Sequence, residues 1–439
     1  MKFSNKSFYN RHKNEMSKYI FNKNTLHIVG KYSANKINLK GCETIVLDLT
    51  KHQPYPNSDI NKKFERILLT DIIESHPDVF SLLEAVKKML TVDGKLIISS
   101  VNTKYLFLNK ILETLNLKDR NPNNSYIHLK KINQVTNGVG LEYQKYYTKQ
   151  FFPFKLFYLG NIINKILEVI FFHFNLGIKT YMIFRPTEKG SINLSKSIII
   201  PAKNEEGNLE ELVERIPNFN NTEIIFAYGE SNDNTLKIMN KIMNNNSDFD
   251  FKIINQTKNG KANAVWEALQ TVENEVIAIL DADISVDPET LADFFKIIEN
   301  NNADFVNGTR LVYEMEKNSM RFLNKLGNRF FQYFISRIIK EQLTDSLCGT
   351  KVFKKSYLND LILWQNIFKR EDPFGDFDLI FAASYSGHKI VELPIVYRER
   401  KYGTTQISRF KDGFKLLSYL LSSFVVFNTS IEKKIKFDV

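Results

Sequence analysis

Two aspartates, Asp281 and Asp283, stand one residue apart directly after an apolar run at 276–280. Five consecutive apolar residues bounded by polar ones predict a strand that is buried on both faces. Open α/β sheets bind ligands at the carboxyl ends of such strands. Carboxylates there are unfavourable unless a cation or hydrogen bonds compensate them, so we expect a divalent cation that also contacts a diphosphate. Since structural or solvated Asp-x-Asp pairs are common, the position after the strand carries the prediction.

Three further apolar runs precede this one, and each is followed by a polar turn. The runs are 197–201, 223–227 and 251–254, and the turns are 202–208, 229–235 and 258–264. Helical patterns begin at 209 and within the third turn. Strands that alternate with helices predict a mostly parallel sheet in which all four turns meet at one edge. The sequence therefore predicts an α/β domain with a ligand site along that edge.

These turns carry four short motifs in a fixed order. They are Pro-Ala-Lys-Asn-Glu-Glu (201–206), Ser-Asn-Asp-Asn-Thr (231–235), Asn-Gly-Lys-Ala (259–262) and Asp-Ala-Asp (281–283). The ordered set resembles the inverting family 2 glycosyltransferases with a GT-A fold, and within them the branch of dolichyl- and polyprenyl-phosphate sugar synthases. Further matches lie downstream, at 307–310, 345–351, 374–378, 392–395 and 400–407, so the resemblance covers residues 195–425.

The resemblance implies a site for a nucleotide-diphosphate sugar. Asn204, Glu205 and the turn at Asp233 would hold the nucleoside, and Lys261 would approach the nucleotide. Asp283, with help from Asp281, would hold Mg²⁺ or Mn²⁺, which neutralises charge on the leaving diphosphate. The full donor-binding set implied in this way is Pro201, Ala202, Asn204, Glu205, Glu230, Asp233, Lys261, Asp281, Ala282, Asp283 and Arg400. Arg400 has two interpretations, a phosphate contact or a solvated cation beside Glu399.

The segment 374–378 bears on the acceptor. An inverting transfer to a sugar hydroxyl needs a carboxylate base within hydrogen-bond reach. Asp376 and Asp378 match acidic positions of the family, and Asp378 is the first choice as base; the alternative for either residue is to cap the following helix. A lipid phosphate acceptor is already ionised and needs no strong base.

Two positions depart from the family pattern. The second motif often begins with an acid, whereas this chain has Tyr228 and Gly229, with Glu230 displaced. Ser285 stands where polyprenyl-phosphate enzymes often carry glutamine. The nucleotide base and the lipid acceptor therefore stay open.

The first 186 residues predict a separate Rossmann-like α/β domain. Strand-like runs lie at 25–30, 44–48, 64–71 and, after a turn, 92–99. Together with Glu-Ser-His at 74–76, this succession resembles a class I S-adenosylmethionine methyltransferase domain. The first loop lacks the family's glycine cluster, however, since Gly30 is followed by Lys31 and Tyr32 with no second glycine until Gly41.

The second loop of this domain departs from the family in another way. Asp48 stands where a ribose would be held, but the stretch 49–63 is too short for a full strand-helix repeat. We interpret the domain as a degenerate one with a structural or acceptor-binding role. A working methyltransferase that binds S-adenosylmethionine is the alternative.

Composition bears on the partners and the compartment. The chain has 60 Lys+Arg against 49 Asp+Glu, a net charge of +11, which suits nucleotide sugars, lipid phosphates or an anionic membrane surface. No nucleic-acid module is recognised. The two cysteines, Cys42 and Cys348, have no paired spacing, so neither a disulfide framework nor a cysteine zinc site is expected. We expect residence in the cytoplasm.

Membrane contact is predicted to be peripheral at most. Residues 1–24 are too polar for a signal peptide, and charged residues interrupt the apolar stretch 162–174. The stretch 414–427 predicts either a terminal helix packed on the sheet or an amphipathic helix resting on anionic lipid at the inner face of the membrane.

The predicted organisation has four parts: a methyltransferase-like domain (1–186), a linker (187–194), a glycosyltransferase domain (195–428) and a tail (429–439). The predicted function is an inverting, metal-dependent transfer of sugar from a nucleotide-diphosphate donor to a polyprenyl phosphate or glycan, in the synthesis of cell-surface polysaccharide or glycolipid. The alternatives are a bifunctional methyltransferase and glycosyltransferase, or a non-catalytic binding scaffold. The sequence leaves the sugar, the base, the acceptor and the oligomeric state open.

Overall fold

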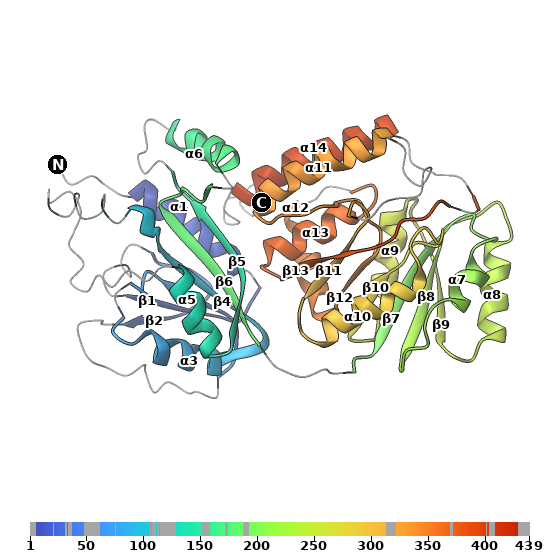
Figure 1. Ribbon diagram of the computed structural model, residues 1–439, viewed down its shortest axis with the longest axis horizontal. Coiled ribbons are helices and arrows are strands. Elements are labelled where there is room, and N and C mark those ends of the chain that lie inside the picture. Colours follow the sequence, from blue (N-terminus) through green and yellow to red (C-terminus); the bar gives the residue numbers. More distant parts are fainter. Residues whose placement is uncertain are drawn as a thin grey trace. The chain divides into compact units, whose positions relative to one another are not determined.

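The computed structural model of the chain divides into two compact units, Met1–Glu188 with Asn428–Val439, and Lys189–Phe427 (Figure 1). The structure describes residues 6–20, 22–30, 33, 37–47, 62–74, 76–105, 107, 111, 114, 129–151, 159–171, 174–187, 193–312, 322–368, 372–400, 402–403 and 409–428. Asp48, Lys31, Tyr32, Ser75, most of the predicted linker and the whole predicted tail lie outside these residues.

The second unit is built on a seven-stranded sheet with the order β13-β11-β12-β10-β7-β8-β9. Every strand runs in the same direction except β12, which is antiparallel to both of its neighbours. The strands are β7 (Lys196–Ala202), β8 (Thr222–Tyr228), β9 (Asp250–Asn255), β10 (Val276–Ile279), β11 (Phe305–Thr309), β12 (Lys351–Lys354) and β13 (Ile390–Pro394). The predicted mostly parallel sheet and its four buried or half-buried strands are confirmed.

Helices cover both faces of this sheet. Because successive side chains of a strand point to opposite faces, Ile198 and Ile200 of β7 join one core with residues of α7, α8 and α10. On the other face α9 packs against β7 and β8, and α12 packs against α13. The helices are α7 (Leu209–Glu214), α8 (Thr235–Asn245), α9 (Lys261–Leu269), α10 (Leu291–Glu299), α11 (Phe322–Ile339), α12 (Leu358–Phe368), α13 (Asp376–Tyr385) and α14 (Arg409–Asn428).

The reversed strand β12 matters for the site. An antiparallel strand begins at the edge where its parallel neighbours end, and Lys351, the first residue of β12, lies opposite Ile279, the last residue of β10. The residues just before β12 therefore reach the same edge as Asp281. If β12 were parallel to its neighbours, as a strict alternation of strands and helices predicts, the residues before it would lie at the opposite edge of the sheet.

The first unit contains a six-stranded sheet with the order β2-β1-β3-β4-β6-β5. The first four of these are parallel, β6 is antiparallel to β4, and β5 is antiparallel to β6. The strands are β1 (Thr25–Gly30), β2 (Glu43–Leu47), β3 (Phe64–Thr70), β4 (Leu90–Val101), β5 (Leu141–Lys149) and β6 (Lys179–Pro186). The turn and strand predicted within 92–99 form one continuous strand, because β4 begins at Leu90 and a shift in the β3–β4 register accommodates the irregularity.

The described helices of this unit are α1 (Lys6–Met16), α3 (Val79–Met89), α5 (Leu129–Gly138) and α6 (Leu159–Ile170). Residues of α3 and α5 form one core with Ile67 and Ile98, whereas Met16 at the end of α1 belongs to the core on the opposite face with Leu68 and Ile97. One core therefore lies on each face of the sheet.

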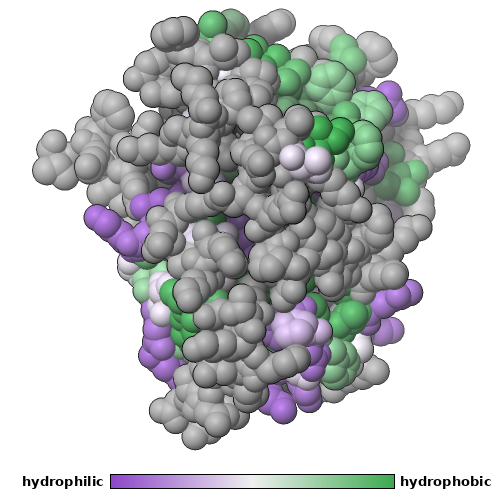
Figure 2. All heavy atoms as spheres, turned by 90° about the vertical axis from the view of Figure 1, so that its left-hand side faces the viewer, coloured by the Kyte–Doolittle hydropathy of each residue, from purple (hydrophilic) through white to green (hydrophobic). Residues whose placement is uncertain are grey.

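In the helix α6, polar side chains are buried and apolar side chains are exposed, the reverse of a helix that packs on an apolar core. Asn164 and Glu168 are buried, whereas Leu159, Ile162 and Ile166 are each more than half exposed. Figure 2 shows the side that is on the left in Figure 1, with hydrophobic side chains near the top of the view. Among the described residues, no helix combines the length and the apolar character needed to cross a bilayer.

Candidate functional site

Two loops at the carboxyl ends of β7 and β8 are joined by hydrogen bonds. The Asn204 backbone N–H donates to Ser231 Oγ at 3.1 Å, and Asn204 Oδ1 accepts from the Asn232 N–H at 2.8 Å. Asn204 has φ +55°, a left-handed conformation that asparagine tolerates better than most residues. The predicted nucleoside residues Asn204, Glu205 and Asp233 therefore meet in one place, next to the buried Ala202 and the strand residue Pro201.

Asp233 itself closes the second of these loops. Its carboxylate accepts from the Thr235 N–H at 3.0 Å and from the Glu206 N–H at 3.3 Å. Although partial burial opposes it, these bonds lower the pKa of Asp233. Glu230 lies exposed in the same loop. The loop is thus pre-formed by its own side chains.

Asp281 lies beyond the end of β10 and pairs with Lys261, the first residue of α9. Both side chains keep about a third of their surface exposed, 32% and 28%. The backbone at Gly349 is close to this pair, since a Cβ there would lie 2.0 Å from Asp281 Oδ2 and 2.7 Å from Lys261 Nζ. Only glycine fits at this position without moving the pair.

Asp283 pairs with Arg400, whose Nη2 donates to Asp283 Oδ2 at 2.6 Å. Arg400 Nη1 also lies 3.9 Å from Glu205 Oε1. Burial raises the pKa of Glu205 to about 7, and Asn208 and Arg400 oppose the shift. Of the two interpretations of Arg400, the solvated cation beside Glu399 is wrong, because its guanidinium bridges two acids of the site.

The backbone turn after the aspartates is strained. Ile284 has φ +51°, which is rare for a β-branched residue, and its side chain is buried. Asp283 Oδ1 accepts from the Ser285 N–H at 3.0 Å and from Ser285 Oγ at 2.7 Å. Ser285, which departs from the family pattern, therefore fixes the orientation of Asp283.

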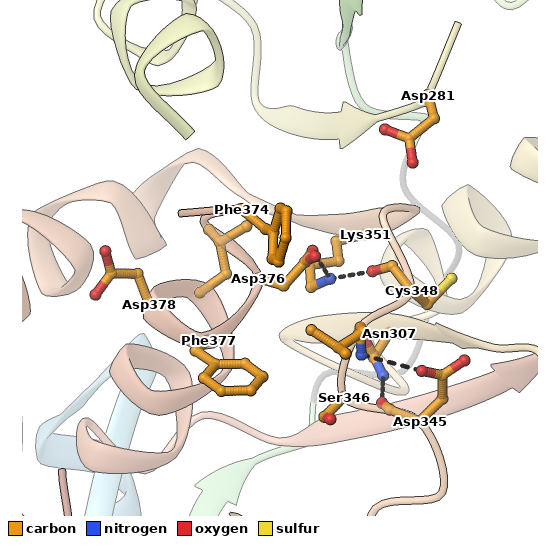
Figure 3. Close-up of polar contacts among 12 residues, drawn as sticks. Asp281, Asn307, Asp345, Ser346, Cys348, Lys351, Phe374, Asp376, Phe377 and Asp378 are labelled. Atoms are coloured by element: carbon orange, nitrogen blue, oxygen red, sulfur yellow. Dashed lines mark hydrogen bonds and ion pairs between the residues drawn. The ribbon is translucent and has the colours of Figure 1, made fainter. Parts of the chain in front are cut away.

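Asp376 belongs to the same group of charges. Lys351 Nζ, fully buried, donates to Asp376 Oδ1 at 2.5 Å and also to the Cys348 carbonyl oxygen (Figure 3). Burial raises the pKa of Asp281, but the charges of Lys261 and Lys351 outweigh this effect and lower it. In the same way, the charges of Asp281 and Asp376 raise the pKa of Lys261 against the effect of its burial. Asp376 and Asp281 thus share a cationic neighbourhood.

Asp378 is not part of this group. In Figure 3 its carboxylate points away from Asp376 and Asp281. Asp378 Oδ1 accepts from Trp364 Nε1 at 2.9 Å and from the Tyr419 hydroxyl, so it links α13 to α12 and α14. The structure therefore does not bring the first-choice base to the site.

Neither Asp376 nor Asp378 caps α13. That role falls to Asp372, whose Oδ2 accepts from the backbone N–H groups of Phe377 at 2.6 Å and Asp378 at 3.1 Å. The proposed capping role was assigned to the wrong aspartate, because the chain turns at Gly375, with φ +80°, and brings Asp372 back over the helix start.

Sequence reasoning missed several residues that build the site. Arg310 forms a two-pronged pair with the fully buried Asp345, through Nε at 2.7 Å and Nη2 at 3.0 Å. Against the effect of burial, Arg310 lowers the pKa of Asp345 to about 2. Lys351 and Gly349 were also missed as site residues. All four stand in segments that match the family, 307–310 and 345–351, and that match was the available signal.

The residues at the edge fit a divalent cation in part. Among the described residues, no three His, Cys, Asp or Glu side chains gather as a closed metal cage. Magnesium, however, is commonly held by one or two carboxylates together with substrate phosphates. Asp281 and Asp283 supply hard oxygen ligands, and their present partners Lys261 and Arg400 are cations that a diphosphate would attract. These carboxylate ligands therefore fit a metal that arrives with a diphosphate.

In the first unit, the described residues of the Glu-Ser-His stretch make internal contacts. Glu74 Oε1 accepts from the Val101 N–H at 2.7 Å, and His76 Nδ1 accepts from the Asp78 N–H at 3.1 Å. His12 of α1, fully buried, is hydrogen-bonded to the Tyr181 hydroxyl at 2.8 Å and to Ser99 Oγ at 3.3 Å. Burial lowers the pKa of His12 to about 3, so the ring is neutral.

The second unit is thus an α/β domain whose predicted ligand residues gather at one edge of its sheet. Residues 197–362 match the family model described as glycosyl transferase family 2. The chain is similar to this family over these residues, and the protein is a glycosyltransferase.

Known relatives share this part of the chain. The dolichol-phosphate mannosyltransferase of Pyrococcus furiosus is 26% identical over 253 residues, which cover 55% of this chain and 67% of the relative. The UDP-N-acetylglucosamine–dolichyl-phosphate N-acetylglucosaminyltransferase of Methanococcus voltae is 27% identical over 238 residues, 51% of this chain and 94% of the relative. Among solved structures, glucosyl-3-phosphoglycerate synthase of Mycobacterium tuberculosis with Mn²⁺ and UDP is 14% identical, with a TM-score of 0.40, over 53% of this chain and 80% of that one.

Proposed function

We propose that the second unit transfers a hexosyl group, with inversion, from a nucleotide-diphosphate sugar to a polyprenyl phosphate. The observation that carries this proposal is the convergence of Asp281 and Asp283 with three cations, Lys261, Lys351 and Arg400, at the edge of one sheet. Acids that hold a metal, surrounded by cations that attract phosphate, suit a diphosphate leaving group. The loops around Asn204 and Asp233 supply the nucleoside side of the same site.

The roles of the residues follow from their chemistry. Asp281 and Asp283 would hold Mg²⁺ or Mn²⁺, which supplies Lewis-acid stabilisation of the departing diphosphate. Lys261 and Arg400 exchange their carboxylate partners for phosphate oxygens when the donor binds. Asn204, Glu205, Asp233 and the strand end at Pro201 and Ala202 orient the nucleoside. In this proposal Lys261 and Arg400 bind the phosphate groups of the nucleotide sugar.

A polyprenyl phosphate suits the acceptor side. Asp376, the acid of the segment 374–378 that shares the charges of the donor site, is compensated by Lys351 at 2.5 Å, and an acceptor that arrives ionised needs no strong base. Two of the relatives are named for transfer to dolichyl phosphate. A glycan hydroxyl is the second candidate, because Asp376 lies in the site and could then accept the proton. Either reaction suits the synthesis of cell-surface glycolipid or polysaccharide at the inner face of the membrane.

Transfer assays test this proposal. Radiolabelled UDP- and GDP-hexoses are supplied with detergent-solubilised polyprenyl phosphate or with oligosaccharide, in the presence of Mg²⁺ or Mn²⁺. We expect labelled polyprenyl-phosphate sugar from at least one donor. No product with any donor and either acceptor would favour the non-catalytic scaffold instead.

The two aspartates of α13 should differ in their effect on transfer. Asp376→Asn removes the partner of a buried ammonium beside Gly349, so transfer should fall about tenfold or more. Asp378→Asn should keep transfer within about threefold of the wild type, because Trp364 and Tyr419 hold that side chain away from the site. Initial rates measure both. A larger loss in Asp378→Asn than in Asp376→Asn would restore Asp378 as the base.

The same variants should differ in the pH dependence of stability. Burial and the charge of Asp378 raise the pKa of Asp372 to about 7, and burial raises the pKa of Asp378 to about 6. The unfolded chain releases these protons near pH ~4, so the stability that the two groups contribute is lost as the pH rises from about 4 to about 7. Asp378→Asn should weaken the fall in urea midpoint between about pH 4 and about pH 7, and Asp376→Asn should retain most of it.

We assign the first unit a supporting role as a degenerate methyltransferase-like domain. Its strand order reverses between β1 and β3, which is where a doubly wound sheet binds its ligand. At that edge Asp71 pairs with Lys179, and the neutral His12 lies against Ser99. Isothermal titration should therefore detect no binding of S-adenosylmethionine at millimolar concentration. Binding with one-to-one stoichiometry would favour the bifunctional enzyme.

A further inference from the structure

The turn that precedes β12, residues 344–350, reaches the proposed donor site with its backbone. A Cβ at Gly349 would lie 2.0 Å from Asp281 Oδ2. The carbonyl oxygen of Cys348, one residue earlier, accepts from Lys351 Nζ. A shift of this turn would therefore move the charges around Asp281, so the contacts that hold the turn also hold the site.

At its start the same turn is bound to Glu392 of β13. Glu392 Oε2 accepts from the Thr344 N–H at 2.7 Å and from the Thr344 hydroxyl at 2.9 Å. Glu392 Oε1 accepts from the Asp345 N–H at 3.1 Å and from Asn307 Nδ2 at 3.4 Å. Both carboxylate oxygens are thus occupied, and three of these four donors belong to the turn.

Asn307 of β11 connects Glu392 and the turn a second time. The two residues lie opposite each other in the β11–β13 register, and Asn307 is fully buried. Its Nδ2 also donates to the carbonyl oxygen of Asp345 at 2.8 Å (Figure 3). Because an amide nitrogen carries two hydrogens, one side chain contacts both the carboxylate and the turn.

The environment of Glu392 differs from that of Asp345, the other carboxylate of this region. The guanidinium of Arg310 faces Asp345 and lowers its pKa to about 2. Among the described residues, the donors to Glu392 are neutral, and burial raises its pKa although these hydrogen bonds oppose the shift. A partly buried carboxylate with neutral partners costs free energy. Glu392 therefore serves the geometry of the turn more than the stability of the fold.

We propose that Glu392 is a positioning residue for the transfer reaction, which acts through the turn 344–350 on the placement of Asp281 and Lys261. In the sheet order β13 lies three strands away from β10, about 14 Å at the usual strand spacing, so Glu392 acts through the backbone of the turn and not by contact with the metal or the diphosphate. This inference rests on the proposed function and deepens it, because it adds a residue outside the site that sets the geometry at the diphosphate.

Glu392→Gln in the full chain tests the proposal, because it keeps the size of the side chain and changes one acceptor into a donor. The amide oxygen can still accept from Thr344, whereas the amide nitrogen then faces the N–H of Asp345 and the amide of Asn307, which are donors as well. We expect the turn to shift, Mn²⁺ affinity in the presence of UDP or GDP to fall about tenfold, and kcat to fall about tenfold. Electron paramagnetic resonance of Mn²⁺ and initial rates measure the two effects.

Glu223→Gln is the matched control. Glu223 is a buried carboxylate near the amino end of β8, at the opposite edge of the sheet, and accepts from the Ser197 hydroxyl and from the Glu273 N–H at 3.1 Å. It also pairs with Lys252 at 2.9 Å, so the control variant should lose at least as much stability as Glu392→Gln. Thermal unfolding measures both losses. Mn²⁺ affinity and kcat of the control should stay at the wild-type values.

The affinity separates positioning from partial unfolding. An unfolded fraction lowers the number of Mn²⁺ sites and leaves the affinity of the remaining sites unchanged. Thr344→Val is a milder second variant, since it removes one donor to the same carboxylate at constant volume, and it should lower the affinity about threefold. Wild-type affinity in whichever of Glu392→Gln and Thr344→Val is folded, or an equal loss in Glu223→Gln, would overturn the proposal.

The outcome for Glu392 is separable from that for the reaction. Wild-type protein that binds Mn²⁺ with nucleotide and transfers no sugar would refute the proposed function, and the comparison of affinities would still decide the role of Glu392. Sugar transfer by the wild type together with unchanged Mn²⁺ affinity in Glu392→Gln would refute the positioning role alone.

Discussion

Replacing Asp283 with alanine should reduce sugar transfer by about a thousandfold, because the change removes a metal ligand at the diphosphate. Asp283 ends the Asp-Ala-Asp motif, is mostly buried, and is fixed by Ser285 and Arg400. Excess chelator should abolish wild-type activity to the same degree, and added Mg²⁺ or Mn²⁺ should restore it. Electron paramagnetic resonance of Mn²⁺ with UDP or GDP should report weaker binding to the variant.

Two companion variants separate the metal from the turn. Asp283→Asn can still accept from the Ser285 N–H and hydroxyl but loses the charge, so its loss should approach that of the alanine variant. Asp287→Asn makes the same charge change at a carboxylate that faces Arg215 and Arg398, and transfer should be unaffected. Full activity of Asp283→Ala, or of the wild type in chelator, would refute the metal assignment.

The residues that gather at the proposed donor site could be predicted from the sequence because they stand at or shortly after strand ends. Asp281 comes directly after an apolar run, Asn204 and Asp233 lie in the polar turns that follow two other runs, and a parallel sheet brings all such turns to one edge. Local pattern therefore determines both the strand and the place of the polar residues after it. Lys261 is predictable for the same reason, as the first residue of the helix that follows β9.

The acceptor side did not follow in the same way, because it depends on packing. Asp376 and Asp378 are two positions apart at the start of α13, so they lie on different faces of the helix. Which of them faces the site is decided by Trp364 and Tyr419, which come from other helices and bind Asp378. Likewise, Lys351 reaches the site only because β12 runs antiparallel, and nothing local in the sequence fixes that direction.

Replacing Gly349 with alanine should lower kcat/KM for the donor about a hundredfold while the fold is retained. The added Cβ would lie 2.0 Å from Asp281 Oδ2 and 2.7 Å from Lys261 Nζ. Both atoms are the ends of flexible, partly exposed side chains, so they can move at little cost to stability. Their movement separates the pair that approaches the diphosphate, and a displacement of about 1 Å in a catalytic geometry is enough for a loss of this size.

The control for this variant is Gly327→Ala, where a Cβ on α11 meets nothing within 4 Å. Alanine is favoured over glycine within a helix, so this change should keep or slightly raise stability and leave transfer intact. In Gly349→Ala the unfolding midpoint should match the wild type, whereas Mn²⁺ affinity in the presence of nucleotide should fall along with kcat/KM. Wild-type kinetics in a folded Gly349→Ala protein would mean that the Asp281–Lys261 pair does not take part in donor binding, and the site would then have to lie around Asp283 and Arg400 alone.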